Sequence, residues 1–210
     1  MIPYLNNKRW LDITRDERFF CAELYFALTH MENIAAFIAW LNSQGLNTKL
    51  PEDNNWQVGY EVVFYRDMVK EFGAPSEKDN KITTRKVAET EFSRKRTFDL
   101  TLFHPEHIVI IEAKAYQGLT TTQVNSFRKD KEMIEKLLVK QGNQKPNVHL
   151  VLLCTQHYRN STRTKHIPEF DGVITWKGLA KNAKLWRGTE NSIACFERAD
   201  DQMGSLATPP

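Results

Sequence analysis

The segment RTFDLTLFHPEHIVIIEAKAYQ, residues 96–117, decides the expected fold. It contains two apolar runs separated by HPEH, the pattern expected of two strands joined by a tight turn. The second run is wholly apolar from Ile108 to Ile111, yet a glutamate and a lysine separated by one alanine follow it directly. An aspartate, Asp99, interrupts the first run. Ionised side chains are costly to remove from water unless they are paired or metal-bound, so these charges need an explanation.

The pairing of the two strands determines whether these charges meet. If residues 98–103 pair antiparallel with residues 108–113, residues whose numbers sum to 211 lie opposite one another. Asp99 then faces Glu112, and Lys114 points to the same sheet face. A shift by one residue would send Asp99 to the opposite face. The alternative interpretation is a cross-strand ion pair on a solvated surface, which contributes little to stability.

Two carboxylates on one sheet face repel each other unless a cation lies between them. The ligands available here are oxygens, from Asp99, Glu112 and the main-chain carbonyl of Ala113. Oxygen ligands suit a hard cation such as Mg²⁺ or Mn²⁺. The pattern therefore indicates a metal site at the end of the second strand.

The rest of the chain predicts helices first and strands later. Expected helices are residues 12–28, beginning at Asp12 or Thr14, then 32–45 and 120–142. Residues 56–73 are expected to form a helix, with a strand over 60–65 as the alternative. Further strands are expected at 83–92 and 148–154, and a short strand followed by a helix within 170–186. This order predicts an α/β fold with a mixed β-sheet core and flanking helices.

The length of 210 residues favours one domain. We expect an N-terminal helical region, residues 1–80, that packs on the core, an α/β core at 81–190 and a C-terminal tail at 191–210. The last part of this tail, from Glu197 onward, is expected to be frayed.

Composition describes an ordinary globular protein, with 41% hydrophobic and 26% charged residues. The absence of an apolar run of signal-peptide or membrane-spanning length predicts a cytoplasmic protein with no membrane partner. Three widely spaced cysteines predict neither disulfides nor a zinc site. The net charge is only +3, but basic runs indicate a polyanion partner, with a solvated surface as the alternative. These runs are residues 85–96, 158–166 and 177–187.

The aspartate, the hairpin and the Glu-x-Lys ending together resemble the PD-(D/E)xK nuclease superfamily, which has the restriction-endonuclease-like fold. In this chain the motif is Asp99, followed by Glu112, Ala113 and Lys114, and Phe98 replaces the usual proline.

Three further features outside the hairpin extend this resemblance. A glutamate on an N-terminal helix would be Glu17 or, as the second choice, Glu23. A helix directly follows the lysine strand and leads to another apolar strand. That helix has a glutamine near its start, Gln123, with the aromatic Phe127 four residues later.

The resemblance implies metal-dependent hydrolysis of phosphodiester bonds in DNA. Asp99, Glu112 and the Ala113 carbonyl would hold one or two Mg²⁺ or Mn²⁺ ions, with Glu17 as a direct or water-mediated ligand. Lys114 would orient or deprotonate the attacking water and stabilise charge at phosphorus. Gln123 is either a site residue or a simple polar residue at a helix start.

Several histidines and a tryptophan are further candidates for the site. His104 and His107 are turn residues rather than a zinc pair, and Trp176 is a packing residue rather than a base-stacking one. Phosphate contact by His157 or His166 is a hypothesis, since both follow an apolar strand.

DNA is the expected partner. Restriction enzymes and resolvases generally use two active sites to cut two strands, which makes a homodimer one expectation and a complex with protein partners another. The alternative function is a catalytically inactive or partner-dependent nucleic-acid-binding module with a nuclease-like fold. The intact aspartate, glutamate and lysine argue against the inactive form.

Overall fold

A five-stranded mixed β-sheet forms the centre of the computed structural model, which describes residues 14, 16–72, 96–116, 118–140, 145–161 and 167–202. The strands lie in the order β1-β2-β3-β4-β5. β1 (Gln57–Val62), β2 (Phe98–His104) and β3 (His107–Ala113) are antiparallel neighbours. β4 (Asn147–Cys154) and β5 (Gly172–Thr175) continue the sheet in parallel with β3. The predicted class, a mixed α/β sheet flanked by helices, is confirmed.

The β2–β3 hairpin has the predicted register. Leu100 lies opposite Ile111, and the other pairs follow the same numbering. Pro105 and Glu106 form the turn, in which the main-chain N–H of Glu106 donates a hydrogen bond to His104 Nδ1 at 3.1 Å. His104 therefore takes part in the turn, as the sequence predicted.

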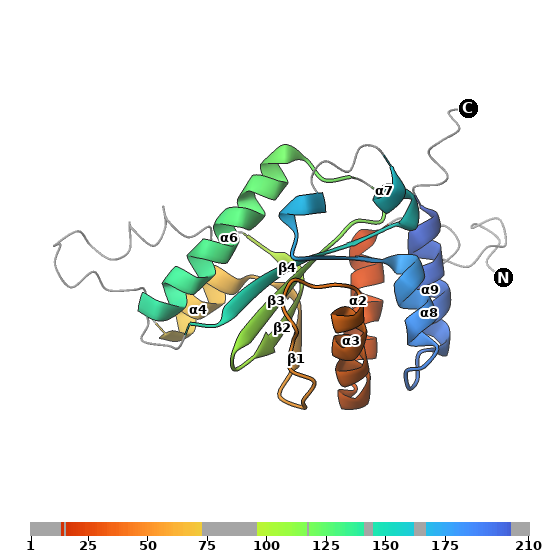
Figure 1. Cartoon of the computed structure of the whole chain (residues 1–210), viewed down its shortest axis with the longest axis horizontal. Coiled ribbons are helices and arrows are strands. Elements are labelled where there is room, and N and C mark those ends of the chain that lie inside the picture. Colours follow the sequence, from red (N-terminus) through yellow and green to blue (C-terminus); the bar gives the residue numbers. More distant parts are fainter. Residues whose placement is uncertain are drawn as a thin grey trace.

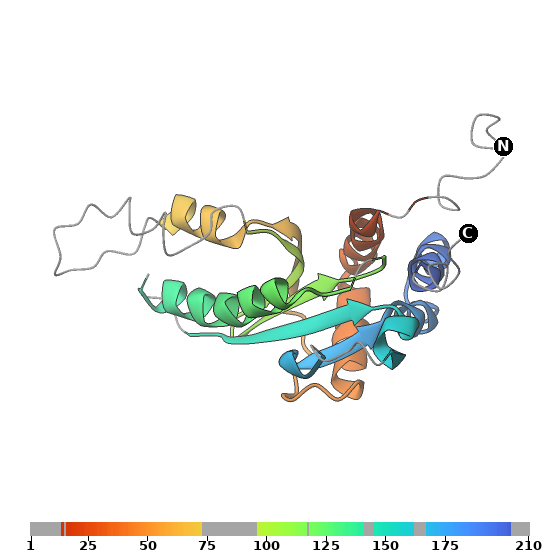
Figure 2. The same cartoon turned by 90° about the horizontal axis from the view of Figure 1, so that it is seen from above.

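Helices cover both faces of the sheet (Figures 1 and 2). α2 (Glu17–Leu28), α3 (Met31–Ser43), α8 (Trp176–Ala183) and α9 (Glu190–Asp201) share one hydrophobic core with the strands. α4 (Phe64–Phe72), α6 (Thr121–Lys140) and α7 (Gln156–Asn160) belong to the other. Along β3, Val109 and Ile111 face the first core, whereas Ile108 and Ile110 face the second. This double burial explains why the strand is an unbroken apolar run.

The start of α2 differs from the prediction. The described helix begins at Glu17, and Thr14 is not helical; Asp12 lies outside the described residues. Asp16 is the N-cap, and its side chain accepts a hydrogen bond from the main-chain N–H of Arg18 at 3.0 Å. A short polar side chain directly before the first turn satisfies an amide that would otherwise lack a partner. Asp16 directly precedes the first helical residue and therefore takes this role.

The prediction of a single helix over residues 56–73 is wrong in its first half. β1 occupies Gln57–Val62 and pairs with β2, with Val58 opposite Leu102. The helix, α4, begins only at Phe64. Pairing with a buried neighbouring strand satisfies the backbone and outweighs helix propensity, which is a weak preference.

The expectation of a frayed tail from Glu197 is wrong as far as Asp201. α9 buries Cys195, Phe196 and Ala199 in the first core, against α8 and α2. These apolar residues form a narrow stripe among charged residues, so the sequence of the segment looks polar although one face of the helix is buried. The strand expected at residues 83–92 lies outside the described residues, whereas α6, β4, β5 and α8 lie where the sequence predicted.

Within the described ranges, no helix taken singly has the length and apolar character needed to cross a membrane. α2 and α3 meet the length and hydropathy requirements only when they are taken together, and the chain bends by 112° at the break between them.

Candidate functional site

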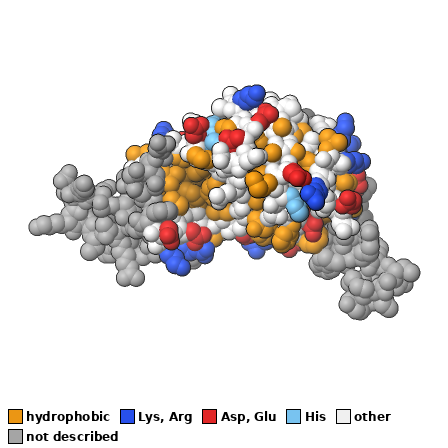
Figure 3. All heavy atoms as spheres, turned by 90° about the horizontal axis from the view of Figure 1, so that it is seen from below, with side chains coloured by type: hydrophobic (Ala, Val, Ile, Leu, Met, Phe, Trp, Pro, Cys, Tyr) orange, Lys and Arg blue, Asp and Glu red, His pale blue; other side chains and the backbone are white. Residues whose placement is uncertain are grey.

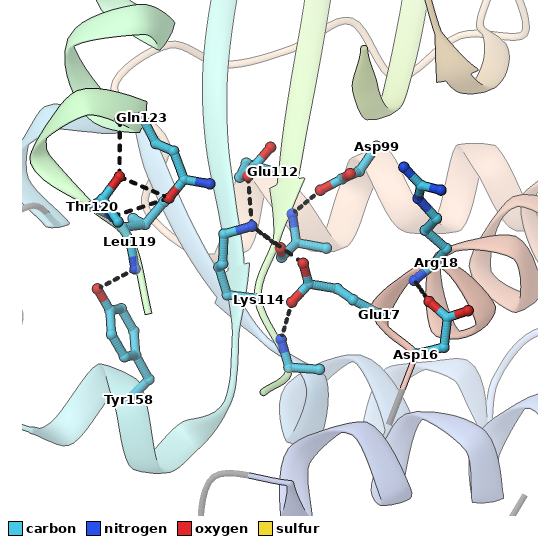
Figure 4. Close-up of polar contacts among 12 residues, drawn as sticks. Asp16, Glu17, Arg18, Asp99, Glu112, Lys114, Leu119, Thr120, Gln123 and Tyr158 are labelled. Atoms are coloured by element: carbon cyan, nitrogen blue, oxygen red, sulfur yellow. Dashed lines mark hydrogen bonds and ion pairs between the residues drawn. The ribbon is translucent and has the colours of Figure 1, made fainter. Parts of the chain in front are cut away.

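Four charged side chains meet at the sheet edge where β3 ends (Figure 4). Asp99 comes from the start of β2, and Glu112 is the penultimate residue of β3. Lys114 follows β3 directly, and Glu17 is the first residue of α2. The antiparallel pairing of β2 and β3 brings the start of one strand beside the end of the other. Helix α2 packs on the same edge and supplies the third carboxylate.

The ammonium group of Lys114 lies at the centre of this cluster. Its Nζ is 2.6 Å from Glu112 Oε1 and 3.2 Å from Glu17 Oε1, and it donates a hydrogen bond to the Ala113 carbonyl at 2.9 Å. Lys114 is only 6% exposed. Burial alone would lower the pKa of Lys114, but the charges of Glu112 and Glu17 outweigh burial and raise it. Lys114 is therefore a protonated, hydrogen-bond-donating group here.

Main-chain amides hold two of the carboxylates. Asp99 Oδ2 accepts a hydrogen bond from the N–H of Ala113 at 2.9 Å. Glu17 Oε2 accepts one from the N–H of Ala115 at 2.6 Å. The backbone at the end of β3 thus orients groups from β2 and α2, and each contact uses one oxygen of its carboxylate.

Burial changes the proton affinity of two of these acids. Burial, with a further contribution from the charge of Asp99, raises the pKa of Glu112 to about 7. Burial also raises the pKa of Glu17, although Lys114 partly offsets the effect. If all three carboxylates of these four side chains are ionised, the cluster has a net charge of −2, because Lys114 is its one cationic member. A divalent cation would neutralise this charge.

Trp176 fixes the backbone below the cluster. Its indole Nε1–H donates a hydrogen bond to the carbonyl of Lys114 at 3.2 Å. The ring is fully buried and contacts the rings of Phe20 and Phe196. The packing interpretation of Trp176 is confirmed, but sequence reasoning missed its hydrogen bond. The position of Trp176 directly after a short strand was the available signal, because parallel strands end at the same sheet edge.

Gln123 caps the helix that follows the motif. Its Oε1 accepts a hydrogen bond from the N–H of Thr120 at 3.0 Å, and its own N–H donates to Thr120 Oγ1 at 3.2 Å. This reciprocal pair is a capping box, which favours the helix-start interpretation of Gln123. Figure 4 shows the amide nitrogen of Gln123 directed toward the side of the cluster that contains Lys114. The preceding residue, Leu119, donates its N–H to the hydroxyl of Tyr158 at 3.3 Å, which ties this loop to α7.

The second-choice helix glutamate, Glu23, does not join the cluster. Its Oε2 accepts a hydrogen bond from Ser192 of α9 at 3.3 Å. Of the two glutamates, α2 brings only Glu17 to the end of β3.

An arginine that sequence reasoning did not single out lies next to the motif. Arg96 donates from Nε to Asp130 Oδ2 at 2.8 Å, and its guanidinium carbon lies 4.3 Å from the centroid of the Phe127 ring. Tyr65 donates its hydroxyl to Asp130 Oδ1 at 2.8 Å. Phe127, the aromatic residue four positions after Gln123, therefore packs against a partly buried ion pair.

The donor set at the end of β3 fits a hard divalent cation, because it consists of carboxylate and carbonyl oxygens. Glu112, Glu17 and the Ala113 carbonyl already converge on one cationic group, the Lys114 ammonium. Among the residues that the structure describes, no group of three or more His, Cys, Asp or Glu is arranged to hold a metal ion. The carboxylates would have to reorient from the ammonium to coordinate one.

A hollow of about 440 Å³ lies at the opposite end of β2 and β3, where Trp56, His104 and Pro105 line it. His157 is an exposed residue of α7, and its contact with phosphate stays a prediction. His166 lies outside the described residues.

Comparison of the chain with protein-family models, with curated proteins and with solved structures finds no match.

Proposed function

We propose that this chain is a metal-dependent nuclease of the PD-(D/E)xK type that hydrolyses phosphodiester bonds in DNA. The observation that carries the proposal is the convergence of Asp99, Glu112, Lys114 and Glu17 at one sheet edge. These residues come from three separate segments of the chain. Buried ionisable groups with raised pKa values gather preferentially at functional sites.

The order of elements supports a restriction-endonuclease-like fold. Among the described residues, α2 with the glutamate precedes the aspartate strand β2, and α3, β1 and α4 lie between them. The Glu-x-Lys strand, helix α6 and the parallel strand β4 then follow in turn. These are the features, outside the three motif residues, on which the resemblance rests.

Asp99, Glu112 and the Ala113 carbonyl would hold Mg²⁺ or Mn²⁺, and Glu17 would bind it directly or through water. When bound, the metal lowers the pKa of a water molecule and screens the phosphate oxygens. Lys114 would donate hydrogen bonds that orient this water and stabilise negative charge at phosphorus. The raised pKa of Lys114 supports this donor role and does not support removal of a proton by Lys114.

Exposed lysines on α8 support a polyanionic substrate. Lys177 and Lys181 lie on α8, and Lys184 is its C-cap; the three are exposed and are spaced four and three residues apart. α8 follows β5 directly, so this row begins at the sheet edge that contains the cluster. A duplex bound at the cluster would then have a row of positive charges along its backbone.

The test is a cleavage panel of supercoiled, linear, single-stranded and branched DNA, and RNA, with Mg²⁺, Mn²⁺ or EDTA. We expect metal-dependent DNA cleavage that falls about 100-fold or more in Asp99→Asn, Glu112→Gln and Lys114→Met. Lys131→Met is the matched control, because it removes a lysine from an ion pair with Asp171 outside the cluster.

Wild-type cleavage rates in all three folded variants would refute this assignment. Salt-sensitive DNA binding by the wild type, without cleavage under any metal, would instead favour the inactive or partner-dependent module. Co-purifying proteins would then indicate the partner-dependent module, and their absence would indicate the inactive one.

A further inference from the structure

The ammonium of Lys114 contacts three of the oxygens that the proposed function assigns to a metal. Glu112 Oε1 and Glu17 Oε1 lie 2.6 Å and 3.2 Å from Nζ, and the Ala113 carbonyl accepts its hydrogen bond at 2.9 Å. Each of these oxygens has more than one lone pair, but an ammonium and a divalent cation held by the same oxygens would lie within a few ångströms of each other and repel.

The side chain of Lys114 can leave this position without disturbing the fold. Its stem has four flexible carbons, whereas its backbone is fixed. The carbonyl of Lys114 accepts the hydrogen bond from buried Trp176, and its N–H donates to the carbonyl of Leu153 at 2.7 Å. An exchange of cations therefore requires rotation of the Lys114 side chain and reorientation of the carboxylates, without a change in the backbone.

The charge of the cluster indicates where a displaced ammonium would go. When all three carboxylates are ionised, a divalent cation neutralises the net charge of −2, so the ammonium would lose most of its attraction to the carboxylates. A buried cation that has lost its partners requires a new anion. The phosphate of a bound substrate is the anion expected beside the metal.

We propose that Lys114 is an internal competitor of the metal, and that metal binding transfers its ammonium to a substrate phosphate, so that metal and DNA bind cooperatively. This inference rests on the proposed function and names a regulation of the same site. By linkage, DNA must strengthen metal binding by the same factor by which metal strengthens DNA binding.

The experiment measures Mg²⁺ affinity by isothermal titration calorimetry, with and without a short DNA duplex whose phosphorothioate linkages resist cleavage. We expect the duplex to tighten Mg²⁺ binding by wild type at least about fivefold. Without DNA, Lys114→Met should bind Mg²⁺ at least about fivefold more tightly than wild type, and DNA should then add little.

Arg18→Met is the matched control for the loss of a nearby positive charge. Arg18 pairs with Glu61 at 3.4 Å and adjoins Glu17 in the sequence. If competition for the oxygens is the cause, Arg18→Met should change Mg²⁺ affinity much less than Lys114→Met. Lys114→Gln provides a second test if the methionine variant does not fold, because its amide can still donate to the Ala113 carbonyl.

Equal or weaker Mg²⁺ binding by the folded Lys114 variants would overturn the inference, and so would the absence of Mg²⁺ binding by wild type and variants alike. Cleavage is not part of this readout. Coupled metal and DNA binding without cleavage would therefore retain the inference and refute the nuclease function. Cleavage without the predicted gain in Mg²⁺ affinity would support the nuclease function and refute the inference.

Discussion

At the scale of single residues, the cluster is organised by main-chain amides as much as by opposite charges. Asp99 and Glu17 each accept a hydrogen bond from the backbone next to Lys114. Such bonds to ionised acceptors are among the stronger ones in proteins. They fix both carboxylates at the end of β3, on either side of Lys114 in the sequence.

The two glutamates of α2 allow the role of Glu17 to be tested against a matched control. Glu17→Gln keeps an oxygen for the N–H of Ala115 but loses the charge, so we expect metal affinity or activity to fall about 10-fold or more. Glu23→Gln alters a hydrogen bond to Ser192 outside the cluster and should have little effect. The measurement is the cleavage rate as a function of Mg²⁺ concentration for both variants. Similar losses in both would contradict the assignment of Glu17 as a ligand.

At the scale of the element, α8 links the cluster to the surface. Trp176, its first residue, anchors the backbone of Lys114, and the lysines that follow are exposed. One helix thus combines a buried end at the site with a basic outer row.

Replacing Lys177, Lys181 and Lys184 together with alanine should weaken DNA binding and its dependence on salt. Each lost phosphate contact should reduce the slope of log affinity against log salt by about 0.9. Fluorescence anisotropy over a salt series measures this slope. The control replaces three exposed lysines outside α8, namely Lys49, Lys70 and Lys136. An unchanged slope in the α8 variant would show that DNA does not follow this helix.

At the scale of the whole molecule, the sheet has a second buried polar group at the end opposite the cluster. His107 Nδ1 and His149 Nε2 lie 3.0 Å apart and share a hydrogen bond. Burial lowers the pKa of His149 to about 4, and the neighbouring His107 adds to the effect. Lys131 acts in the same direction, whereas Asp171 opposes it.

This histidine should make stability depend on acid. Between pH 6.5 and about 4, His149 is protonated in the unfolded chain but neutral in the folded protein, so the free energy of unfolding falls as the pH falls. Its contribution over this range is about 3 kcal/mol. Urea unfolding of wild type and His149→Gln at both ends of the range measures it.

The difference in unfolding free energy between wild type and His149→Gln isolates the contribution of His149. The raised pKa of Glu112 has the opposite effect, stabilising the metal-free fold as the pH falls through 7, but it is present in both proteins and cancels. We expect wild type to lose stability relative to His149→Gln on acidification. A constant difference across the range would contradict the prediction.

The expected homodimer is also a question at this scale, and it stays a prediction. Figure 3 shows apolar side chains gathered on the underside of the molecule, between charged ones. Phe26, at the end of α2, and Met31, at the start of α3, are each 63% exposed. Exposed apolar residues of this kind occur on monomers as well as at interfaces.

Sequence alone determined the hairpin and its register. The side-chain period of a strand is two, and a two-residue turn leaves one register for the β2–β3 pair. Asp99 and Glu112 could therefore be placed at the same sheet edge, and their oxygens indicated a hard cation. The apolar runs of α6 and β4 were equally clear, because their periodicity is a local property.

Only the tertiary structure decided which other residues reach this edge. α2 places Glu17 there and turns Glu23 toward α9, Gln123 caps its own helix, and Trp176 binds the backbone of Lys114. Strand β1 likewise formed where helix propensity competed with it. These outcomes depend on apolar packing and strand pairing between segments distant in the chain, whose free energies exceed local preferences of a fraction of a kcal/mol per residue. The contact of the Lys114 ammonium with Glu17 has the same origin, because only the docking of α2 on the sheet brings them together.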